Sequence, residues 1–124
     1  MTASSPEDLL QSLLKGLNSG DVDGVVGLYE PTAVLAEDPG HALEGRDAIK
    51  ALIAAFSASK SRFTLHGFEV VKTGDVALVR SRWTVNTVDD SGRPLETTVS
   101  PAHVVRRNEA GHWLVAIDWP IVTK

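Results

Sequence analysis

Apolar residues near the start of the chain repeat at spacings of one, three and four, which is the pattern of an α-helix with one buried stripe. The stripe consists of Leu9, Leu10, Leu13, Leu14 and Leu17. Ser5, followed by Pro6 and then by Asp8, is typical of a helix start, because serine caps the first turn and proline suits its first position. Gly20 can take the left-handed conformation that ends a helix. The pattern predicts a helix between Ser5 and Gly20.

A second, shorter helix and a strand are predicted next. Asp21 can cap this helix, and Pro31 stops it. Its buried side consists of Val22, Val25, Val26 and Tyr29. Residues 32–37 have the composition of a short strand, and residues 38–40 combine the usual turn residues Asp, Pro and Gly. Residues 45–47 then open a third helix, whose apolar positions are Ala48, Ile49, Leu52, Ile53 and Phe56.

The period changes after Ser57, where runs rich in Val, Thr and aromatic residues begin. These runs cover residues 63–71, 76–88, 95–105 and 113–121. Short connections that contain glycine separate them, which predicts consecutive hairpins. Helices followed by a long antiparallel meander define the α+β class. The length of 124 residues predicts a single domain over 1–124.

Composition excludes several classes of function. With 12 Lys and Arg against 16 Asp and Glu, the formal charge is −4, and nucleic acid is not an expected partner because phosphate binding needs a concentrated basic surface. The absence of cysteine excludes disulfides and thiolate ligands. The first residues lack the pattern of a secretion signal, and no apolar run approaches the ~20 residues that span a bilayer. We therefore expect a cytoplasmic protein without a membrane partner.

The four histidines are the remaining candidates for metal ligands. His41, His66, His103 and His112 do not have the spacing of known metal-binding motifs. The sequence also contains neither a glycine-rich phosphate loop nor a Gly-x-Ser-x-Gly nucleophile elbow. We therefore expect neither a metal nor another cofactor.

Three segments together resemble the ketosteroid-isomerase-like proteins, in the SnoaL-like branch of the nuclear transport factor 2-like superfamily. They are Leu17 to Tyr29 (LNSGDVDGVVGLY), EDPG at 37–40 followed by GRDAI at 45–49, and WLVAIDW at 113–119. The resemblance implies a cone-like fold in which three N-terminal helices pack over the concave face of a curved antiparallel sheet and enclose an apolar cavity. The family hosts isomerases, cyclases, hydrolases and non-catalytic binders, so the function must be argued from the site.

The resemblance also implies two catalytic residues. Asp38 matches the carboxylate base of the steroid isomerases, and a carboxylate can move a proton beside a carbonyl. The other interpretation is that Asp38 only forms the turn with Gly40. His103 matches a hydrogen-bond donor for the enolate oxygen, and it shares a strand face with Val99, Pro101 and Val105. It is alternatively a core histidine bonded to a neighbouring carbonyl.

Three further residues are expected to contact a ligand from the helices. Leu13 stands where the steroid isomerases have a tyrosine donor, so half of their oxyanion hole is missing, and one lost donor typically costs ~10²–10³ in rate. Tyr29 is either a substitute donor or part of the buried stripe of the second helix. Phe56 is the expected contribution of the third helix to the pocket.

The strands supply the other expected contacts. Asp118 points into the cavity if Ala116, two residues before it, lines the inward face. Arg82 would then also point inward. It would either bind a polar ligand or form a buried ion pair with Asp118, since buried charges are normally partnered.

The opposite face of this predicted sheet carries an apolar row. Its members are Val79, Trp83, Val85, Trp113, Val115, Ile117 and Trp119. Such a face is costly to leave in water, so a homodimer through the convex face is expected. In the alternative, this row faces the helices and the charged residues face solvent.

Two functions remain open at this stage. In the first, an isomerase or cyclase binds a small, largely apolar carbonyl compound, with Asp38 as the base and His103 polarising the carbonyl. In the second, the chain is a non-catalytic ligand-binding or dimeric assembly domain, an interpretation favoured by Leu13 at the position of the missing donor.

Overall fold

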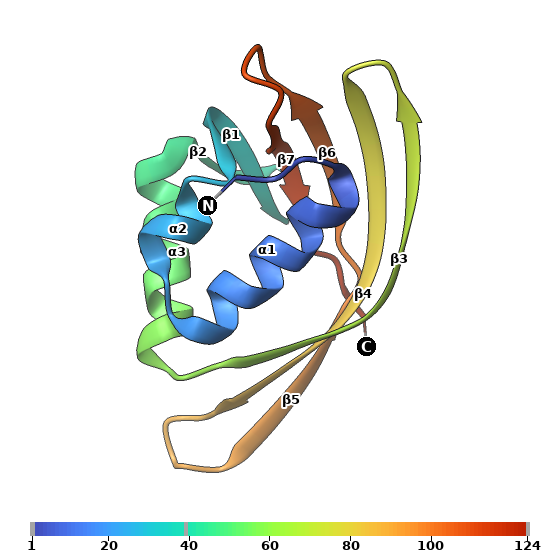
Figure 1. The fold of residues 1–124 in the computed structure, drawn as a ribbon. Helices are drawn as coiled ribbons and strands as arrows, with labels where there is room; N and C mark the ends of the chain where they lie inside the picture. Colours follow the sequence, from blue (N-terminus) through green and yellow to red (C-terminus); the bar gives the residue numbers. More distant parts are fainter. Residues whose placement is uncertain (1, 39, 124) are drawn as a thin grey trace.

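The computed structural model describes residues 2–38 and 40–123, and the side chains of these residues other than Asp38 and Thr123. The helices are α1 (Pro6–Ser19), α2 (Val22–Val26) and α3 (Gly45–Ala58). The strands are β1 (Tyr29–Asp38), β2 (His41–Glu44), β3 (Arg62–Thr73), β4 (Val76–Val88), β5 (Pro94–Val99), β6 (Ala102–Arg107), β7 (Trp113–Trp119) and β8 (Val122–Thr123). The sheet curves around α1, with α2 and α3 beside it (Figure 1), so the predicted α+β fold is confirmed. No helix within these ranges is long and apolar enough to cross a membrane.

The ends of α1 follow from its sequence as predicted. The Asp8 amide donates to the Ser5 side chain at 3.0 Å, which satisfies one of the free N–H groups of the first turn. Gly20 ends the helix with φ at +73°, a conformation that glycine adopts without strain. Leu9 and Leu10 are completely buried against the sheet. The helix is therefore fixed by its caps and by one apolar stripe.

The second helix is shorter than predicted, and Tyr29 does not belong to it. The helix α2 ends at Val26, and Tyr29 begins β1. The Tyr29 carbonyl accepts hydrogen bonds from Arg46 Nε at 3.0 Å and Nη2 at 2.7 Å, and the Leu28 carbonyl accepts from the Val115 amide at 2.8 Å. These long-range partners replace the helical bonds that the local apolar spacing had indicated.

The sheet is not a simple meander. Its strands follow the order β2-β1-β7-β6-β4-β5-β8, and β3 pairs with the other edge of β4. Most neighbours are antiparallel, but β1 and β7 are parallel. The predicted strand over 95–105 is two strands, because the chain breaks at Ser100 and Pro101 and Pro101 has no N–H for a ladder. As a result β6 pairs with β4 at 76–80, and β5 pairs with β4 at 83–88.

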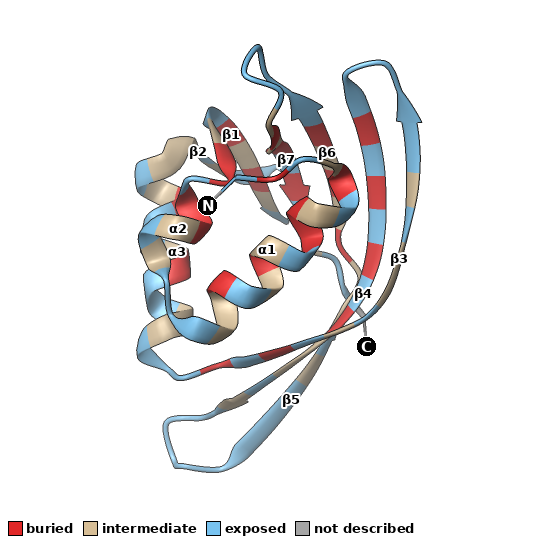
Figure 2. Ribbon diagram, in the orientation of Figure 1, coloured by how far each residue is buried: buried red, intermediate tan, exposed pale blue. Residues whose placement is uncertain are grey.

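The two faces of β4 are the reverse of those predicted from alternation. Figure 2 shows buried and exposed residues alternating along this strand. Val79 and Trp83 are buried under the helices, whereas Arg80 and Arg82 face solvent. The alternation itself is confirmed, but the apolar set covers the concave side because that side is where α1 provides a partner surface.

A β-bulge in β7 explains why its two halves face differently. Val105 pairs with Val115 and the adjacent Val104 with Ile117, so Ala116 is an extra residue without a partner. Before the bulge Val115 points inward, and after it Asp118 points inward while Ile117 is exposed. The predicted inward orientation of Asp118 is thus confirmed, whereas the predicted outward orientation of Trp113 and Val115 is wrong.

We predict that Asn18→Asp destabilises the fold by about 2 kcal/mol. The Asn18 side chain donates to the Phe63 carbonyl and accepts from the Phe63 amide, both at 2.8 Å, and so joins the end of α1 to the start of β3. The aspartate loses the donor and places a negative charge beside the carbonyl. Urea unfolding of this variant and of Gln11→Glu, the same change at an exposed position of α1, measures the effect. Equal free energies of unfolding for Asn18→Asp and Gln11→Glu would show that the two hydrogen bonds between Asn18 and Phe63 do not stabilise the fold.

Candidate functional site

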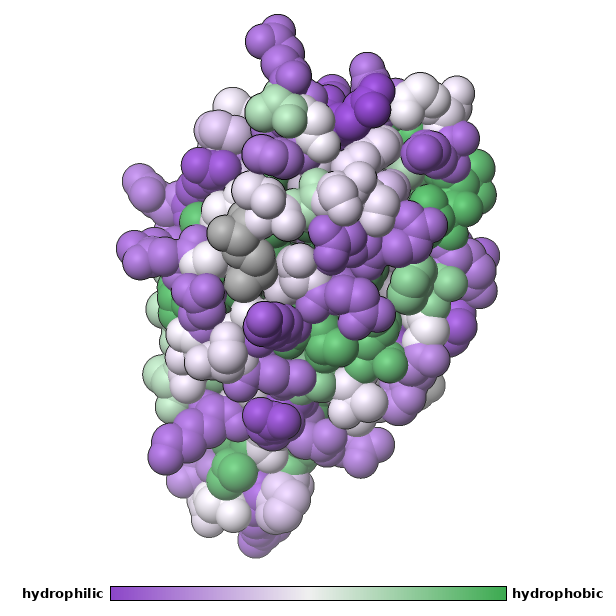
Figure 3. Space-filling model, viewed as in Figure 1, coloured by the Kyte–Doolittle hydropathy of each residue, from purple (hydrophilic) through white to green (hydrophobic). Residues whose placement is uncertain are grey.

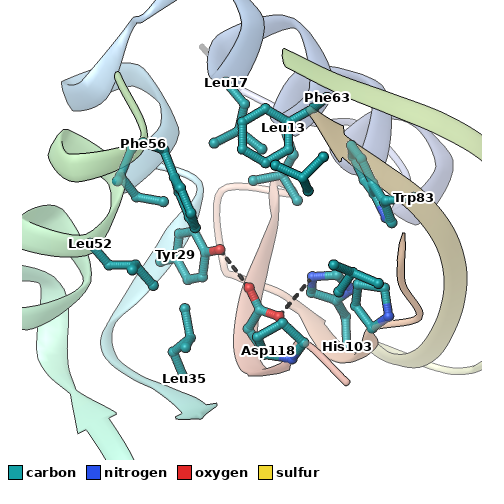
Figure 4. Close-up of a pocket in the computed structure, with 15 residues that line it drawn as sticks. Leu13, Leu17, Tyr29, Leu35, Leu52, Phe56, Phe63, Trp83, His103 and Asp118 are labelled. Carbon is teal, nitrogen blue, oxygen red and sulfur yellow. Dashed lines mark hydrogen bonds and ion pairs between the residues drawn. The ribbon is translucent and has the colours of Figure 1, made fainter. Parts of the chain in front are cut away.

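A cavity of about 120 Å³ lies between the helices and the concave face of the sheet (Figure 4). Its lining is almost wholly apolar. The lining residues are Leu13, Leu17, Tyr29, Leu35, Leu52, Ile53, Phe56, Phe63, Trp83, Val85, Val99, Pro101, His103, Asp118 and Pro120. They come from α1, α3, the six strands β1, β3, β4, β5, β6 and β7, and the connections that contain Pro101 and Pro120, so most of the fold is needed to form the cavity.

Three aromatic side chains form one wall of this cavity. The rings of Phe56 and Phe63 meet edge to face with 5.5 Å between centroids, and Phe63 meets Trp83 in the same way at 6.5 Å. The Trp83 indole N–H donates to the Ser81 hydroxyl at 2.8 Å, so its polar atom is satisfied away from any ligand. This wall therefore offers aromatic surface without a free hydrogen-bond donor.

The polar part of the cavity is a set of three buried side chains, Tyr29, Asp118 and His103, from the neighbouring strands β1, β7 and β6. The Tyr29 hydroxyl donates to Asp118 Oδ2 at 2.7 Å. His103 Nε2 lies 3.2 Å from Asp118 Oδ1, within ion-pair distance. Figure 4 shows both contacts as dashed lines that converge on the Asp118 carboxyl group. The side chains of His103 and Asp118 are 5% and 9% exposed.

These contacts decide the protonation of Asp118 and Tyr29. Burial opposes ionisation of Asp118, but the charge of His103 and the hydrogen bonds from His103 and Tyr29 outweigh it, so the pKa of Asp118 lies below its ordinary value. Burial, together with the Asp118 charge and the hydrogen bond to it, raises the pKa of Tyr29 well above its ordinary value. The site thus holds an aspartate anion and a neutral tyrosine.

The second nitrogen of His103 has no partner. Nδ1 of His103 and Oδ1 of Asp118 are both buried and make no hydrogen bond within the described part of the chain, so the 3.2 Å contact between Nε2 and Oδ1 is an ion pair. When the His103 ring is neutral, the nearby Asp118 carboxylate favours the tautomer that carries its proton on Nε2 and leaves Nδ1 as an acceptor. An unsatisfied buried polar atom costs about 1–3 kcal/mol. Other atoms of the His103 side chain line the cavity.

The structure brings together most of the side chains predicted to form the site. Leu13, Tyr29, Phe56, His103 and Asp118 all line the cavity. The alternative for His103, a bond to a neighbouring carbonyl, is not observed for either ring nitrogen in the described residues.

Two predicted residues, Arg82 and Ala116, do not take part as expected, and the role of a third is not tested. Arg82 lies on the outer face and pairs with Glu69 at 3.1 Å, so both its role in the pocket and its ion pair with Asp118 are wrong. Ala116 is buried at the bulge of β7 but does not line the cavity. The side chain of Asp38 lies outside the described residues, so its role as a base stays a prediction.

Two features of the site were not predicted from the sequence. One is the hydrogen bond from Tyr29 to Asp118, because Tyr29 had been placed on a helix. The other is the contact between Arg46 and the Tyr29 carbonyl, which holds the start of β1. The GRDAI segment contains this arginine, but an arginine that follows glycine at the start of a helix gives no indication of which distant carbonyl it binds.

Metal binding finds no support in the described residues. They contain no group of three or more His, Asp or Glu side chains arranged to hold a metal ion. His41 pairs with Glu37 at 3.5 Å, and His66 shares a hydrogen bond with Thr84 at 2.6 Å. These histidines lie apart from the cavity lining.

Comparison with protein families gives one match that covers most of the chain. The sequence model of the SnoaL-like domain matches residues 10–115. The chain therefore belongs to the SnoaL-like family. No curated protein compared with the chain matches it.

Solved structures share the fold at low sequence identity. An NTF2-like protein with a cystatin-like fold from Novosphingobium aromaticivorans has a TM-score of 0.79 and 22% identity, covering 94% of this chain and 79% of that one. The CaMKII hub of S. rosetta has a TM-score of 0.79 and 25% identity, covering 94% and 93%. A ketosteroid isomerase-like protein from Erwinia carotovora atroseptica has a TM-score of 0.77 and 19% identity, covering 95% and 93%.

We predict that Asp118→Asn lowers the free energy of unfolding by roughly 3 kcal/mol at neutral pH. The folded state lowers the pKa of Asp118 below its ordinary value of 3.8. This contribution is therefore present above that value and is lost as pH falls through the folded-state pKa. Urea unfolding between neutral pH and pH 3 should show the gap between wild type and variant closing below about pH 4.

Asp90→Asn, at an exposed turn, is the matched control and should leave the free energy of unfolding unchanged at neutral pH. A gap between wild type and Asp118→Asn that stays constant from neutral pH to pH 3 would contradict the assignment of a partnered buried carboxylate.

Proposed function

We propose that this chain binds a small, largely apolar carbonyl compound in its cavity and catalyses a proton transfer within it, as an isomerase or cyclase does. The observation that carries the proposal is the unpaired Nδ1 of His103, in a side chain that is fixed on its other side by Asp118 and lines the cavity. A neutral imidazole in this arrangement is a general base. The similarity to a ketosteroid isomerase-like protein is consistent with this class.

The proposed reaction uses His103 and Asp118 in different ways. Nδ1 of His103 takes a proton from the carbon beside the carbonyl, and the resulting imidazolium returns it to another atom of the same molecule. Asp118 does not contact the substrate; it is a positioning residue that orients the ring and stabilises its positive charge. The lining is almost wholly apolar, and an apolar surrounding strengthens the attraction between the two charges.

The stabilisation of the enolate oxygen sets the limit on the rate. Leu13 lines the cavity where the steroid isomerases have a tyrosine, and the Tyr29 hydroxyl proton is used by Asp118. The Trp83 N–H is used by Ser81. The acceleration therefore comes from general base catalysis, which typically contributes 10²–10⁴-fold. We expect a modest catalyst for which His103 is indispensable.

This proposal assigns His103 the role of base that the sequence had suggested for Asp38. Both residues stay candidates, because Asp38 matches the base position of the related isomerases. One set of variants distinguishes the two candidates, because only removal of the residue that acts as the base should abolish the proton transfer.

We predict that the protein exchanges the α-protons of cyclohexanone in D₂O at least ~10²-fold faster than the same concentration of free imidazole. The exchange is followed by loss of the α-proton signals in NMR spectra. His103→Gln should reduce the rate to that of solvent, because glutamine cannot accept a proton. Asp118→Asn should lower the rate and change its pH dependence, because the imidazolium loses its counter-charge.

Two controls accompany this experiment. His66→Gln removes an exposed imidazole outside the cavity and should leave the rate unchanged. Asp38→Asn should also leave it unchanged. Full activity of His103→Gln, with activity lost in Asp38→Asn, would overturn the proposal in favour of Asp38, provided that near-ultraviolet circular dichroism shows both variants folded.

A second proposal concerns assembly, and we infer that the outer face of the sheet binds a second copy of the chain. Leu78, Val104 and Ile117 lie directly beside one another across β4, β6 and β7, and Val71 continues the row on β3. Leu78 is 47% exposed and Val71 72% exposed. Contiguous apolar area of this kind is typical of interfaces. The fold similarity to the CaMKII hub is consistent with self-association.

The opposite side of the molecule has a different character. Figure 3 shows mostly hydrophilic side chains on the side where α1 lies, with one apolar patch near the centre of the view and further apolar side chains at its edge beside β3. The contrast favours the outer face of the sheet as the surface of self-association.

We predict that the wild-type chain sediments as a dimer and that Leu78→Glu sediments as a monomer. The substitution places a charge in the centre of the apolar row, and dimer formation would bury this charge without a partner of opposite charge. Such burial is strongly unfavourable. Analytical ultracentrifugation makes the measurement. Val88→Glu, at an exposed position near the other end of β4, is the matched control and should stay dimeric. A monomeric wild type at about 100 μM would contradict the proposal.

A further inference from the structure

We infer that a hollow on the outer face of the sheet binds a small carboxylate that carries a short apolar tail. The hollow lies beside β4, where β5 ends and β6 begins, on the opposite side of the sheet from the cavity under the helices. The inference does not rest on the chemistry proposed for His103. An unpaired arginine, a free hydroxyl group and apolar walls each contribute one part of it.

The hollow exists because two strands share one edge of β4. Strand β6 pairs with β4 as far as Arg80, and β5 pairs with it from Trp83 onward. Between these two ladders the Ser100 amide donates to the Ile121 carbonyl at 2.7 Å and not to β4. The break leaves an open hollow of about 360 Å³, whose lining includes Arg80, Ser100 and Ile121.

Positive charge exceeds negative charge at this hollow. Arg80 and Arg82 line it, and no acidic side chain of the described residues does. Arg82 reaches across β3 to Glu69, whose two carboxylate oxygens accept from Nη1 at 3.1 Å each. Gly67 makes room for this reach, because a Cβ atom at that position would lie 2.4 Å from Arg82 Nη2. The charge of Arg82 is thus balanced by Glu69.

Arg80 carries the unbalanced charge. Glu69 stands directly opposite Arg80 in the register of β3 and β4, but it bonds Arg82. Arg80 makes no hydrogen bond or ion pair with any other described residue. Its guanidinium group presents N–H donors in a fork that matches the two oxygens of a carboxylate. One surplus charge suits a monocarboxylate better than a phosphate group, which carries about −1.5 to −2 charges at neutral pH.

Ser100 supplies a second polar group. It is half-buried and lines the hollow, and its hydroxyl makes no hydrogen bond within the described part of the chain. A hydroxyl can donate one hydrogen bond to a carboxylate oxygen. The hydroxyl of the neighbouring Ser81 is not available, because it is buried and accepts from the Trp83 indole N–H at 2.8 Å.

The remaining walls of the hollow are apolar and favour a tail on the ligand. Leu78 and Ile121 line it and are 47% and 39% exposed, and Pro101 and Ala102 lie between them in the lining. Contact with an aliphatic tail removes part of this surface from water, which is favourable. The ligand therefore places its carboxylate at Arg80 and its tail along these walls.

The hollow adjoins the apolar row proposed to bind a second copy of the chain. The two share Leu78, but the row crosses the sheet from β3 to β7, whereas the hollow extends along β4 toward Ser100 and Ile121. A small carboxylate is the better occupant, because the surplus charge lies in a recess beside the row.

Binding of sodium hexanoate to the wild-type chain at neutral pH tests the inference, with acetate and hexanol as comparison probes. NMR titration follows the amide signals of Ser100 and Ala102. We expect a dissociation constant of about 1 mM for hexanoate. Acetate should bind about ten-fold more weakly because it lacks the tail. Hexanol should bind at least about ten-fold more weakly because it lacks the charge.

Three variants locate the binding at Arg80. Arg80→Gln removes the charge and should weaken hexanoate binding at least about ten-fold. Arg80→Lys keeps the charge without the planar fork and should give an intermediate affinity. Arg93→Gln removes an exposed arginine that has no ion pair in the described residues and lies between β4 and β5, so it is the matched control and should bind as wild type does.

Four outcomes would overturn the inference. They are unmoved Ser100 and Ala102 signals at about 20 mM hexanoate, equal affinity of Arg80→Gln, equal affinity for hexanol, and a response confined to cavity residues such as Leu13. Unmoved signals together with a monomeric Arg80→Gln in analytical ultracentrifugation would assign Arg80 to the second copy instead. None of these results bears on the role proposed for His103.

Discussion

The buried carboxylate of Asp118 is the constraint on which the rest of the site depends. An ion removed from water costs several kcal/mol unless charge and hydrogen bonds replace the lost hydration. Here Tyr29 and His103 do so, from the strands on either side of β7. Meeting this requirement fixes the position of Tyr29 at the start of β1 and the orientation of the His103 ring. The free nitrogen of His103 is thus a consequence of how the charge of Asp118 is stabilised.

The bulge at Ala116 makes this arrangement possible. Without an extra residue, a strand whose Val115 points inward would place Ile117 inward and Asp118 in solvent. One inserted residue turns Asp118 into the cavity and at the same time turns Ile117 and Trp119 outward, where they are 44% and 45% exposed. The polar site and the apolar outer face therefore have a common structural origin. A change of one residue in the length of β7 would alter both.

Local signals in the sequence were enough to predict the existence of the three helices, the ends of α1 and the class of fold. Ser5 caps the start of α1 and Gly20 caps its end, as their chemistry predicts. Pro101 lies at the break between β5 and β6, although the apolar pattern continues across this position. Strand alternation correctly grouped Val79 with Trp83 and Arg80 with Arg82, but it could not say which group the helices cover. The alternation of apolar and polar residues does not reveal the bulge at Ala116. The position of Tyr29 fits the apolar stripe of a helix as well as it fits a strand. These features depend on long-range pairing, which a local pattern does not contain.

The central claim, that Asp118 fixes the proton of the neutral His103 ring on Nε2 and leaves Nδ1 as an acceptor, can be measured directly. Long-range proton–nitrogen NMR correlations of protein with ¹⁵N-labelled histidine distinguish the two ring nitrogens and show which one carries the proton. The account predicts a protonated Nε2 and a bare Nδ1 in the neutral ring, with the pattern lost in Asp118→Asn. A proton on Nδ1 and a bare Nε2 facing the carboxylate would contradict it.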